Sequence, residues 1–309
     1  MKTLPLGLCF GLAVFAAGCV EFEGQSLTYR HDRKNDRLLV FQEYRNIHAT
    51  GDLDWFSKPT KPRPAPEAPS PTECRELESV MKGQRTFFFA NCFLEYDRDG
   101  VAAGLAEVEK ELPTAAPADA EYLRRQAALM RRILDSVAVA NGDFFLDDSG
   151  RLCGYQCVVV DNLSELVTQA NDLISAAVVR ELPGWTNDFP EASRETIRAY
   201  AGKRRWIQME GNEIRLKFPA TSKSFEEYAQ DPWFPAEVAT TYAAPFCEVS
   251  IGRKNGKSQT IARRAENAAQ SNLVAHVRAT YGIAGNLDVE KIRNDFLATG
   301  AGGPAGAPL

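Results

Sequence analysis

Alternating apolar and polar positions near the start of the chain predict two paired strands. In QSLTYRHDRKNDRLLVFQEYRNIHA, residues 25–49, alternating residues such as Tyr29 and Val40 lie on either side of a polar turn at residues 32–36. Alternation with a period of two is typical of strands with one buried face. Because Asp and Asn favour turns, the pattern predicts a β-hairpin.

The same alternation predicts three further hairpins along the chain. They turn at Asp147–Gly150, at Gly211–Asn212 and at Asn255–Gly256, and Asn-Gly is the strongest short-range hairpin signal. The run RTFFFANCFLEY, residues 85–96, predicts one buried strand. Strands joined by tight turns are antiparallel, because parallel strands need long crossover connections.

Apolar residues at a helical period predict four helices between these strands. The first covers residues 119–137, capped by the aspartate at its start, and the second begins at Asn162 with a capping box completed by Glu165. Shorter helices are predicted from Ser222 and over residues 272–281. The predicted fold class is therefore α+β, an antiparallel sheet built from hairpins and covered by helices. This arrangement disfavours a two-lobed solute-binding protein, whose sheets are mostly parallel.

The first eighteen residues have the features of an export signal. A single cation, Lys2, precedes an apolar run from Leu4 to Ala17. As a helix this run would be about 21 Å long, which is shorter than the roughly 30 Å hydrocarbon core of a bilayer. Glu21 and Glu23 follow closely, so the run has no apolar continuation. We expect a cleaved secretory signal peptide; the alternative is an uncleaved, buried helix.

The residues that end this run, Phe15–Gly18 followed by Cys19, read FAAGC. This stretch resembles the lipobox of bacterial lipoproteins, in which small residues precede an obligatory cysteine. The resemblance covers residues 1–19 only, and Ala16 stands where that family most often has leucine. It implies that the Cys19 thiol receives a diacylglycerol thioether, that the chain is cut just before Cys19, and that the freed amine can take a further acyl group such as palmitate.

The lipobox resemblance also implies a location. A lipid on Cys19 would make the protein membrane-anchored and extracytoplasmic, on the periplasmic face of the cell envelope. Val20 follows the cysteine in place of an aspartate, which favours the outer membrane if enteric-type sorting rules apply. The alternative to anchoring is ordinary secretion without a lipid.

The chain is predicted to divide into five segments. They are the signal peptide (1–18), a membrane-proximal β-hairpin (19–56), a Pro-rich linker (57–71), the α+β main domain (72–297) and a disordered tail (298–309). The linker carries six prolines in fifteen residues, which favours a semi-rigid extended spacer. A lone hairpin is too small to be stable, so we expect it to dock on the main body or to pair with another protein.

Composition and net charge limit the classes of partner that the chain is expected to bind. The chain is 44% hydrophobic with a net charge of −5, as in a globular protein that buries a core. Removal of residues 1–18, which carry one cation and no acid, changes the charge to −6. A nucleic-acid binder needs a basic face, so we expect no nucleic-acid partner. The expected partners are the membrane, through Cys19, and an envelope protein.

Two basic clusters interrupt this acidic chain. One is Lys203–Arg205, and the other surrounds the predicted turn at Asn255–Gly256. The second cluster could contact phosphate or an anionic polysaccharide, but we favour a solvated turn whose cations protect a strand edge. Its members are Arg253, Lys254, Lys257, Arg263 and Arg264.

Five cysteines remain in the mature chain beside Cys19. Cys153 and Cys157 lie in one predicted strand, about 13 Å apart if extended, whereas a disulfide spans at most about 7 Å. Any bridge from them would go to another cysteine. A structural zinc site needs four ligands at short spacings, so we expect buried thiols, one or two disulfides and no metal. The five are Cys74, Cys92, Cys153, Cys157 and Cys247.

Motifs for catalysis and for calcium are incomplete. The chain has only three histidines, His31, His48 and His276, and no nucleophile-elbow, zincin or P-loop motif. The stretch EYDRDG, residues 95–100, resembles the start of a calcium loop, but Ala106 stands where the bidentate glutamate is needed. We therefore expect no catalytic, cofactor or metal residues.

These observations favour a non-catalytic interaction or assembly component of the cell envelope. The alternative is an envelope hydrolase that uses acidic residues. A deep polar cleft holding two of them with shifted pKa values would favour the hydrolase, whereas a flat apolar surface or an exposed strand edge would favour the interaction protein. The candidate carboxylates are Asp97, Asp99, Asp147 and Asp148.

Overall fold

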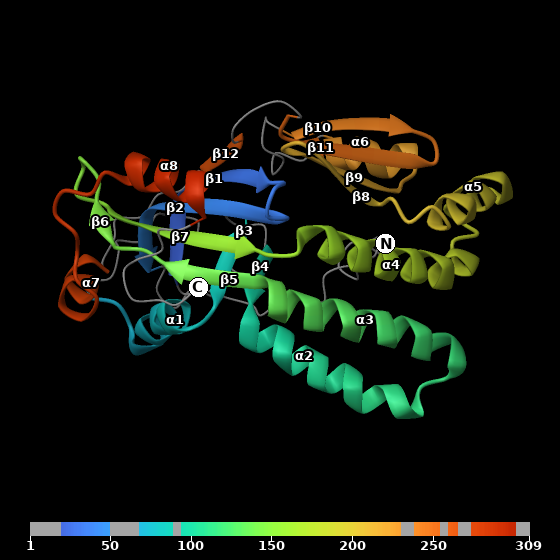
Figure 1. Ribbon diagram of the computed structural model, residues 1–309, viewed down its shortest axis with the longest axis horizontal. Coiled ribbons are helices and arrows are strands. Elements are labelled where there is room, and N and C mark those ends of the chain that lie inside the picture. The colour runs from blue at the N-terminus through green and yellow to red at the C-terminus, as the bar shows by residue number, and fades with distance from the viewer. Residues whose placement is uncertain are drawn as a thin grey trace, which may run out of the picture.

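The computed structural model describes residues 20–49, 68–88, 94–229, 238–253, 259–264 and 273–300. In these ranges two antiparallel sheets and a small two-stranded sheet are accompanied by eight α-helices. The fold is α+β, as the sequence predicts (Figure 1). The predicted signal peptide, Cys19 and most of the Pro-rich linker lie outside the described residues.

A six-stranded antiparallel sheet forms the body of the molecule. Its strands follow the order β12–β1–β2–β7–β5, and β6 pairs with β7 outside this path. The strands are β1 (Val20–Asp32), β2 (Arg37–Ala49), β5 (Val137–Asn141), β6 (Phe145–Leu146), β7 (Leu152–Val160) and β12 (Gln259–Arg264).

The hairpin predicted first lies in the middle of this sheet. β1 pairs with β12 and β2 pairs with β7, so the hairpin is bonded to the rest of the fold along both edges. Both faces of β2 are covered: Leu39 and Phe41 pack with Phe296 of helix α8 (Val289–Thr299), whereas Val40 packs with helices on the opposite face. Neighbours on all sides supply the stability that an isolated hairpin lacks.

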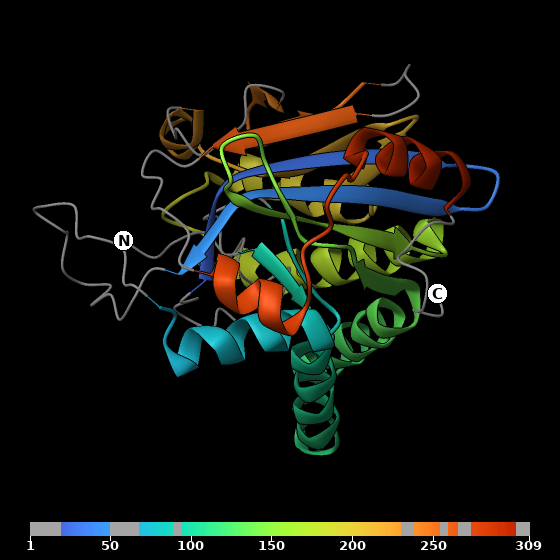
Figure 2. The same cartoon turned by 90° about the vertical axis from the view of Figure 1, so that its left-hand side faces the viewer.

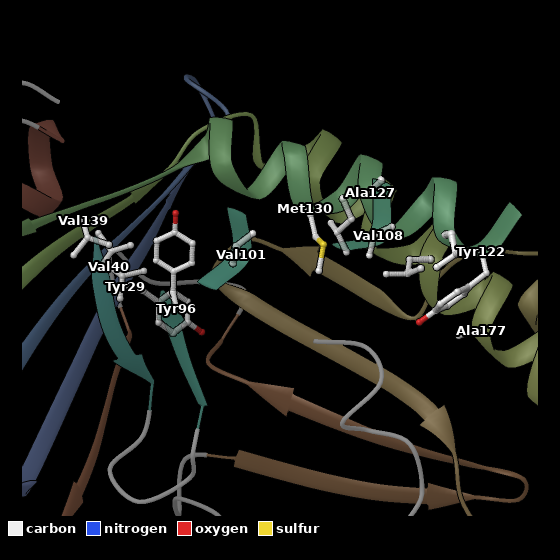
Figure 3. Packing of buried hydrophobic residues seen from close by; sticks show 14 of the residues in the cluster. Tyr29, Val40, Tyr96, Val101, Val108, Tyr122, Ala127, Met130, Val139 and Ala177 are labelled. Atoms are coloured by element: carbon white, nitrogen blue, oxygen red, sulfur yellow. The ribbon is translucent and has the colours of Figure 1, made fainter. Parts of the chain in front are cut away.

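Three long helices form a layer that begins under the sheet and extends beyond it (Figure 1). They are α2 (Arg98–Glu111), α3 (Pro117–Ser136) and α4 (Leu163–Glu181). Their apolar faces join the sheet residues in one core, in which Val101 and Val108 of α2 and Met130 of α3 lie with Tyr29 of β1 (Figure 3). Each large apolar side chain buried in this way contributes roughly 1.5–3 kcal/mol.

The second sheet has four strands in the order β10–β11–β9–β8. Its turn at Gly211–Asn212 confirms the predicted hairpin, and Gly211 has a positive φ of 66°. The Tyr29 hydroxyl of β1 donates to the Asn212 carbonyl at 2.7 Å, which ties the two sheets together. The strands are β8 (Ile207–Glu210), β9 (Glu213–Pro219), β10 (Val238–Ala243) and β11 (Phe246–Ile251).

The remaining helices cover the edges of the fold. Helix α1 (Pro71–Lys82) and helix α7 (Val274–Thr280) lie on the side of the large sheet away from α8 (Figure 2). Helix α5 (Glu191–Ala201) packs on α4, and α6 (Ser222–Ala229) lies beside the second sheet. Among the described helices, none is both long enough and apolar enough to span a membrane.

Two strand predictions were wrong. Residues 85–96 form no single strand; β3 (Arg85–Phe88) and β4 (Leu94–Asp97) pair antiparallel with each other. The hairpin around Asn255–Gly256 does not form either, because β11 is occupied on its two edges by β9 and β10, and β12 instead pairs with β1. The predicted turn itself falls outside the described residues.

Three predicted boundaries also differ. Helix α3 starts at Pro117, where proline presets the helical φ, and not at residue 119. Asn162 precedes α4 with a left-handed φ of 51° and no side-chain cap; instead, the Ser164 hydroxyl donates to the Asp36 carboxylate at 2.6 Å. Helix α8 runs through Thr299, so the tail expected from residue 298 cannot begin there.

Candidate functional site: an apolar cavity beneath helix α1

Helix α1 starts at the end of the Pro-rich segment and owes its position to a capping box. The Glu73 amide donates to the Ser70 hydroxyl at 3.3 Å, and the Ser70 amide donates to the Glu73 carboxylate. Pro71 occupies the first helical position, where its missing amide proton is not needed. The S-P-T-E sequence of this box was visible in the chain, although no helix was predicted there.

The inner side of α1 does not close fully on the sheet. Leu77, Val80 and Met81 face Phe22 and Ile47 across a cavity of about 70 Å³. Since roughly 10–15 Å³ of such space holds one water, the cavity has room for about five waters, or for one small aliphatic group; an apolar cavity that binds benzene is about 150 Å³. Further wall residues are Val20, Tyr44, Glu76, Phe87, Asn141, Gly142, Phe144, Gly154, Tyr155 and Gln156.

The polar side of the cavity is a hydrogen-bonded wall. The Tyr44 hydroxyl donates to Gln156 Oε1 at 2.7 Å, and the Gln156 amide nitrogen donates to Asn141 Oδ1 at 2.6 Å. The Asn141 amide nitrogen in turn donates to the Met81 carbonyl of α1 at 3.0 Å. Burial raises the pKa of Tyr44 to about 12, so its hydroxyl stays protonated at any physiological pH. These polar groups already have partners, and the accessible surface of the cavity is left mainly apolar.

A glycine brings the sheet close enough to form this wall. A Cβ atom on Gly142 would lie 2.2 Å from the Tyr155 ring, which stacks on Phe41 with ring centroids 5.2 Å apart. No real Cβ contact is that short. Gly142 therefore sets the position of Tyr155, and with it one side of the cavity.

The four candidate carboxylates take structural positions elsewhere. Asp97 caps α2 by accepting from the Asp99 amide at 3.1 Å. Asp147 organises the turn between β6 and β7: partial burial would raise its pKa, but hydrogen bonds from Arg151 and Ser149 outweigh this effect and lower it. Asp148 is exposed in the same turn. None of the four lines the α1 cavity, so the structure does not gather them there.

The residues of the calcium-like stretch are also used locally. Glu95 pairs with Arg85 at 3.0 Å, and Asp97 is committed to the helix cap. Within the part of the chain that the structure describes, no group of three or more His, Cys, Asp or Glu side chains could hold a metal ion.

The described cysteines are free thiols. Cys153, Cys157 and Cys247 are buried, and burial raises the pKa of Cys157 to about 12. Cys74 of α1 is half-buried, with its sulfur 3.7 Å from His276 Nδ1 of α7. No disulfide joins these four, whereas Cys92 lies outside the described residues.

The other two histidines bind backbone carbonyls. Nδ1 of His31 lies 3.0 Å from the Gly211 carbonyl, and Nδ1 of buried His48 lies 2.8 Å from the Asn46 carbonyl. Neither lines the α1 cavity.

The structure describes only part of the two predicted basic clusters and does not describe the predicted lipid-attachment site. Cys19, Lys254 and Lys257 lie outside the described residues, and Arg253 is exposed at the end of β11. Arg263 and Arg264 belong to β12, where they are opposite Gln25 and Gly24 of β1. The cluster Lys203–Arg205 directly follows α5, near a second concave surface.

Comparison of the chain with protein-family models, with curated proteins and with solved structures gives no match.

Proposed function

We propose that the chain is a lipid-anchored component of the cell envelope that acts by binding and not by catalysis. In this proposal Cys19 carries the anchor, and the α1 cavity receives one small aliphatic side chain of a partner protein. The observation that carries the proposal is the cavity itself, an apolar space beside a polar wall whose groups already have partners.

The size and chemistry of the cavity support a single apolar side chain as its occupant. A space of about 70 Å³ suits a small aliphatic side chain such as that of Val and is too small for an aromatic ring. Filling it would remove apolar surface from water at roughly 25 cal/mol per Å². It would also leave the bonds among Tyr44, Gln156 and Asn141 intact, so an apolar guest meets no polar penalty.

The position of the cavity supports a partner at the membrane surface. Val20 lines the cavity and follows Cys19 directly in the chain. A lipid on Cys19 would hold the cavity within a few ångströms of the bilayer. Two or three acyl chains anchor a protein far more firmly than one, so the partner would be met repeatedly at that surface.

The anchor is tested by the intact mass of the protein isolated from membranes, beside a Cys19→Ser form. We expect the wild-type mass to equal residues 19–309 plus acyl groups, and the variant to lack them. An unmodified wild-type mass would overturn the anchor.

The cavity is tested by thermal unfolding with and without dissolved xenon, which binds dry apolar cavities. We expect xenon to raise the unfolding midpoint of the wild type but not that of Val80→Phe, which fills the cavity. The matched control Arg75→Phe changes an exposed position of the same helix and should keep the xenon effect.

The partner is tested by a photoreactive phenylalanine analogue at Met81, in intact cells. We expect one adduct of defined mass that disappears when Val80→Phe is added and persists when Arg75→Phe is added. An adduct insensitive to the filled cavity, or no adduct, would overturn the assignment of the cavity to a partner.

A further inference from the structure

A second concave surface lies among helices α3, α4 and α5, beyond the end of the six-stranded sheet (Figure 1). It is an open groove of about 440 Å³. Four arginines line it, and all three helices and the turn after α5 contribute. They are Arg125 of α3, Arg180 of α4, Arg198 of α5 and Arg204 of the turn. We call this surface the arginine groove.

The carboxylates of the groove do not neutralise all of its arginines. Asp172 of α4 is shared by two of them: its carboxylate lies 3.4 Å from Arg125 Nη1 and 3.0 Å from Arg204 Nη1. Arg125 also pairs with Glu121 at 2.8 Å. Arg198 is exposed and has no ion-pair partner among the described residues. Positive charge therefore remains at Arg198 and Arg204, in a chain whose net charge is −5.

Arg180 supplies a fixed wall to the groove. Its guanidinium carbon lies 3.9 Å from the centre of the Tyr122 ring, and its Nη2 donates to Glu181 at 2.9 Å. A more distant contact of 3.9 Å joins it to Asp119. Stacking and ion pairing hold this side chain in place. Arg180 therefore shapes the groove, and an anionic ligand would be bound by the other arginines.

The backbone at Arg204 is strained. Its φ of 51° lies in the left-handed region, which costs an ordinary side chain roughly 1–2 kcal/mol. The other described residues of this kind besides glycine are Asp36, Asn46 and Asn162, whose short polar side chains tolerate the conformation. Strain of this sort concentrates at functional sites. Here it directs the Arg204 side chain over Asp172.

An exposed apolar side chain adjoins the charge. Val179 of α4 is 51% exposed and lines the groove; among the described residues it is the large hydrophobic side chain that stands out to solvent. Tyr122 and Ala176 lie in the same lining. A ligand that matches both features carries an anionic group and an apolar part.

We infer that the arginine groove binds the phosphate of an anionic phospholipid, with Arg198 and Arg204 on the phosphate and Val179 against the adjoining glycerol and acyl carbons. The planar guanidinium presents paired donors that match phosphate oxygens. Free inorganic phosphate offers the same anion without the apolar part. The contact with Val179 therefore separates the two sources of phosphate.

The test is sedimentation of the purified chain of residues 20–309, which lacks both the apolar signal and Cys19, with phosphatidylcholine vesicles, with and without phosphatidylglycerol. Without residues 1–19 binding cannot come from a lipid or from the signal, so this result is independent of the proposed function. We expect binding only to the anionic vesicles, and about a tenfold loss in Arg198→Ala and in Arg204→Ala. Arg131→Ala is the matched control, since Arg131 lies on α3, pairs with Glu109 and is outside the groove.

Further measurements with the same chain separate the alternatives. Val179→Ser should weaken vesicle binding severalfold, and inorganic phosphate at equal concentration should not displace the vesicles. Displacement by phosphate together with no effect of Val179→Ser would overturn the phospholipid in favour of a free anion. Absence of vesicle binding, or equal losses in Arg131→Ala and Arg198→Ala, would overturn the groove as a site.

Discussion

The α1 cavity and the arginine groove are two concave surfaces built on opposite principles. The cavity is small and mainly apolar, and its polar side chains bond to one another. The groove is about 440 Å³, open to solvent and lined by charges that its carboxylates only partly neutralise. The cavity is thus suited to an uncharged group taken out of water, and the groove to a charged group that stays partly hydrated. A substitution that harms one surface by packing should leave the other unchanged.

The largest effect is expected at Gly142. Its replacement by alanine drives a methyl group into the Tyr155 ring, which cannot move without breaking its stack on Phe41. We expect Gly142→Ala to lower the free energy of unfolding by about 2–3 kcal/mol, as overpacked cores do. Urea denaturation measures the change.

The control for this variant is Gly184→Ala. A Cβ atom there would have no heavy atom within 4 Å, so we expect a change below about 0.5 kcal/mol. Equal stability of the two variants would show that the wall of the cavity is softer than its geometry implies.

A smaller loss of folding stability is expected when a hydrogen bond is removed from the polar wall of the cavity. Tyr44→Phe removes the hydroxyl that donates to Gln156 Oε1 and lies 2.9 Å from Gln42 Oε1. The buried Gln156 oxygen is then short of a donor, whereas Gln42 Oε1 keeps its bond from Gln25. We expect a loss of about 1–3 kcal/mol. Tyr242→Phe serves as the control, because the Tyr242 ring stacks on Phe225 and needs no hydroxyl for that contact. Similar losses in both variants would contradict a specific role for the wall.

The two surfaces also differ in how much of them the sequence could reveal. The cluster Lys203–Arg205 is visible in the chain, but Arg125 of α3 and Asp172 of α4, which complete the groove, lie more than thirty residues earlier. The cavity likewise joins distant segments of the first half of the chain, from Val20 to Gln156. Only its first helix has a local signal, the capping box at Ser70. Sites made by distant segments depend on which strands and helices pack together, and no short stretch of sequence specifies that.

The hairpins show the same limit. Gly211–Asn212 was predicted and formed, because its two strands are neighbours in the sheet. Asn255–Gly256 has an equally strong local signal, yet β11 bonds to β9 and β10, and β12 crosses to β1 near the start of the chain. Fold class followed from alternation and turn chemistry. Strand order depended on which edges long-range packing left free.

In the groove, function and stability should separate. Arg204→Asn places a residue that tolerates the left-handed conformation at φ 51°. The substitution relieves strain of roughly 1–2 kcal/mol but loses an exposed ion pair with Asp172, which is worth about 0–1 kcal/mol. We expect the variant to be as stable as the wild type or up to about 2 kcal/mol more stable, while vesicle binding falls.

The matched control is Arg205→Asn, which changes the neighbouring charge at an ordinary backbone conformation. It should leave both the stability and the binding nearly unchanged. Destabilisation by Arg204→Asn would show that the ion pair outweighs the strain.

The smallest effect concerns pH and the turn beside β7. The pKa of Asp147 is lowered in the folded chain: burial opposes the shift, but the hydrogen bonds from Arg151 and Ser149 prevail. A carboxyl with a depressed folded pKa stabilises the fold above its unfolded pKa of about 3.9, and this contribution is lost as the pH falls through the lower, folded value. We therefore expect the stability difference between wild type and Asp147→Asn to shrink as the pH falls from 6 to 2. Since Asp147 is partly exposed, its contribution should stay below about 1 kcal/mol. A difference between wild type and Asp147→Asn that is constant over this range would mean that the turn is held by its backbone alone.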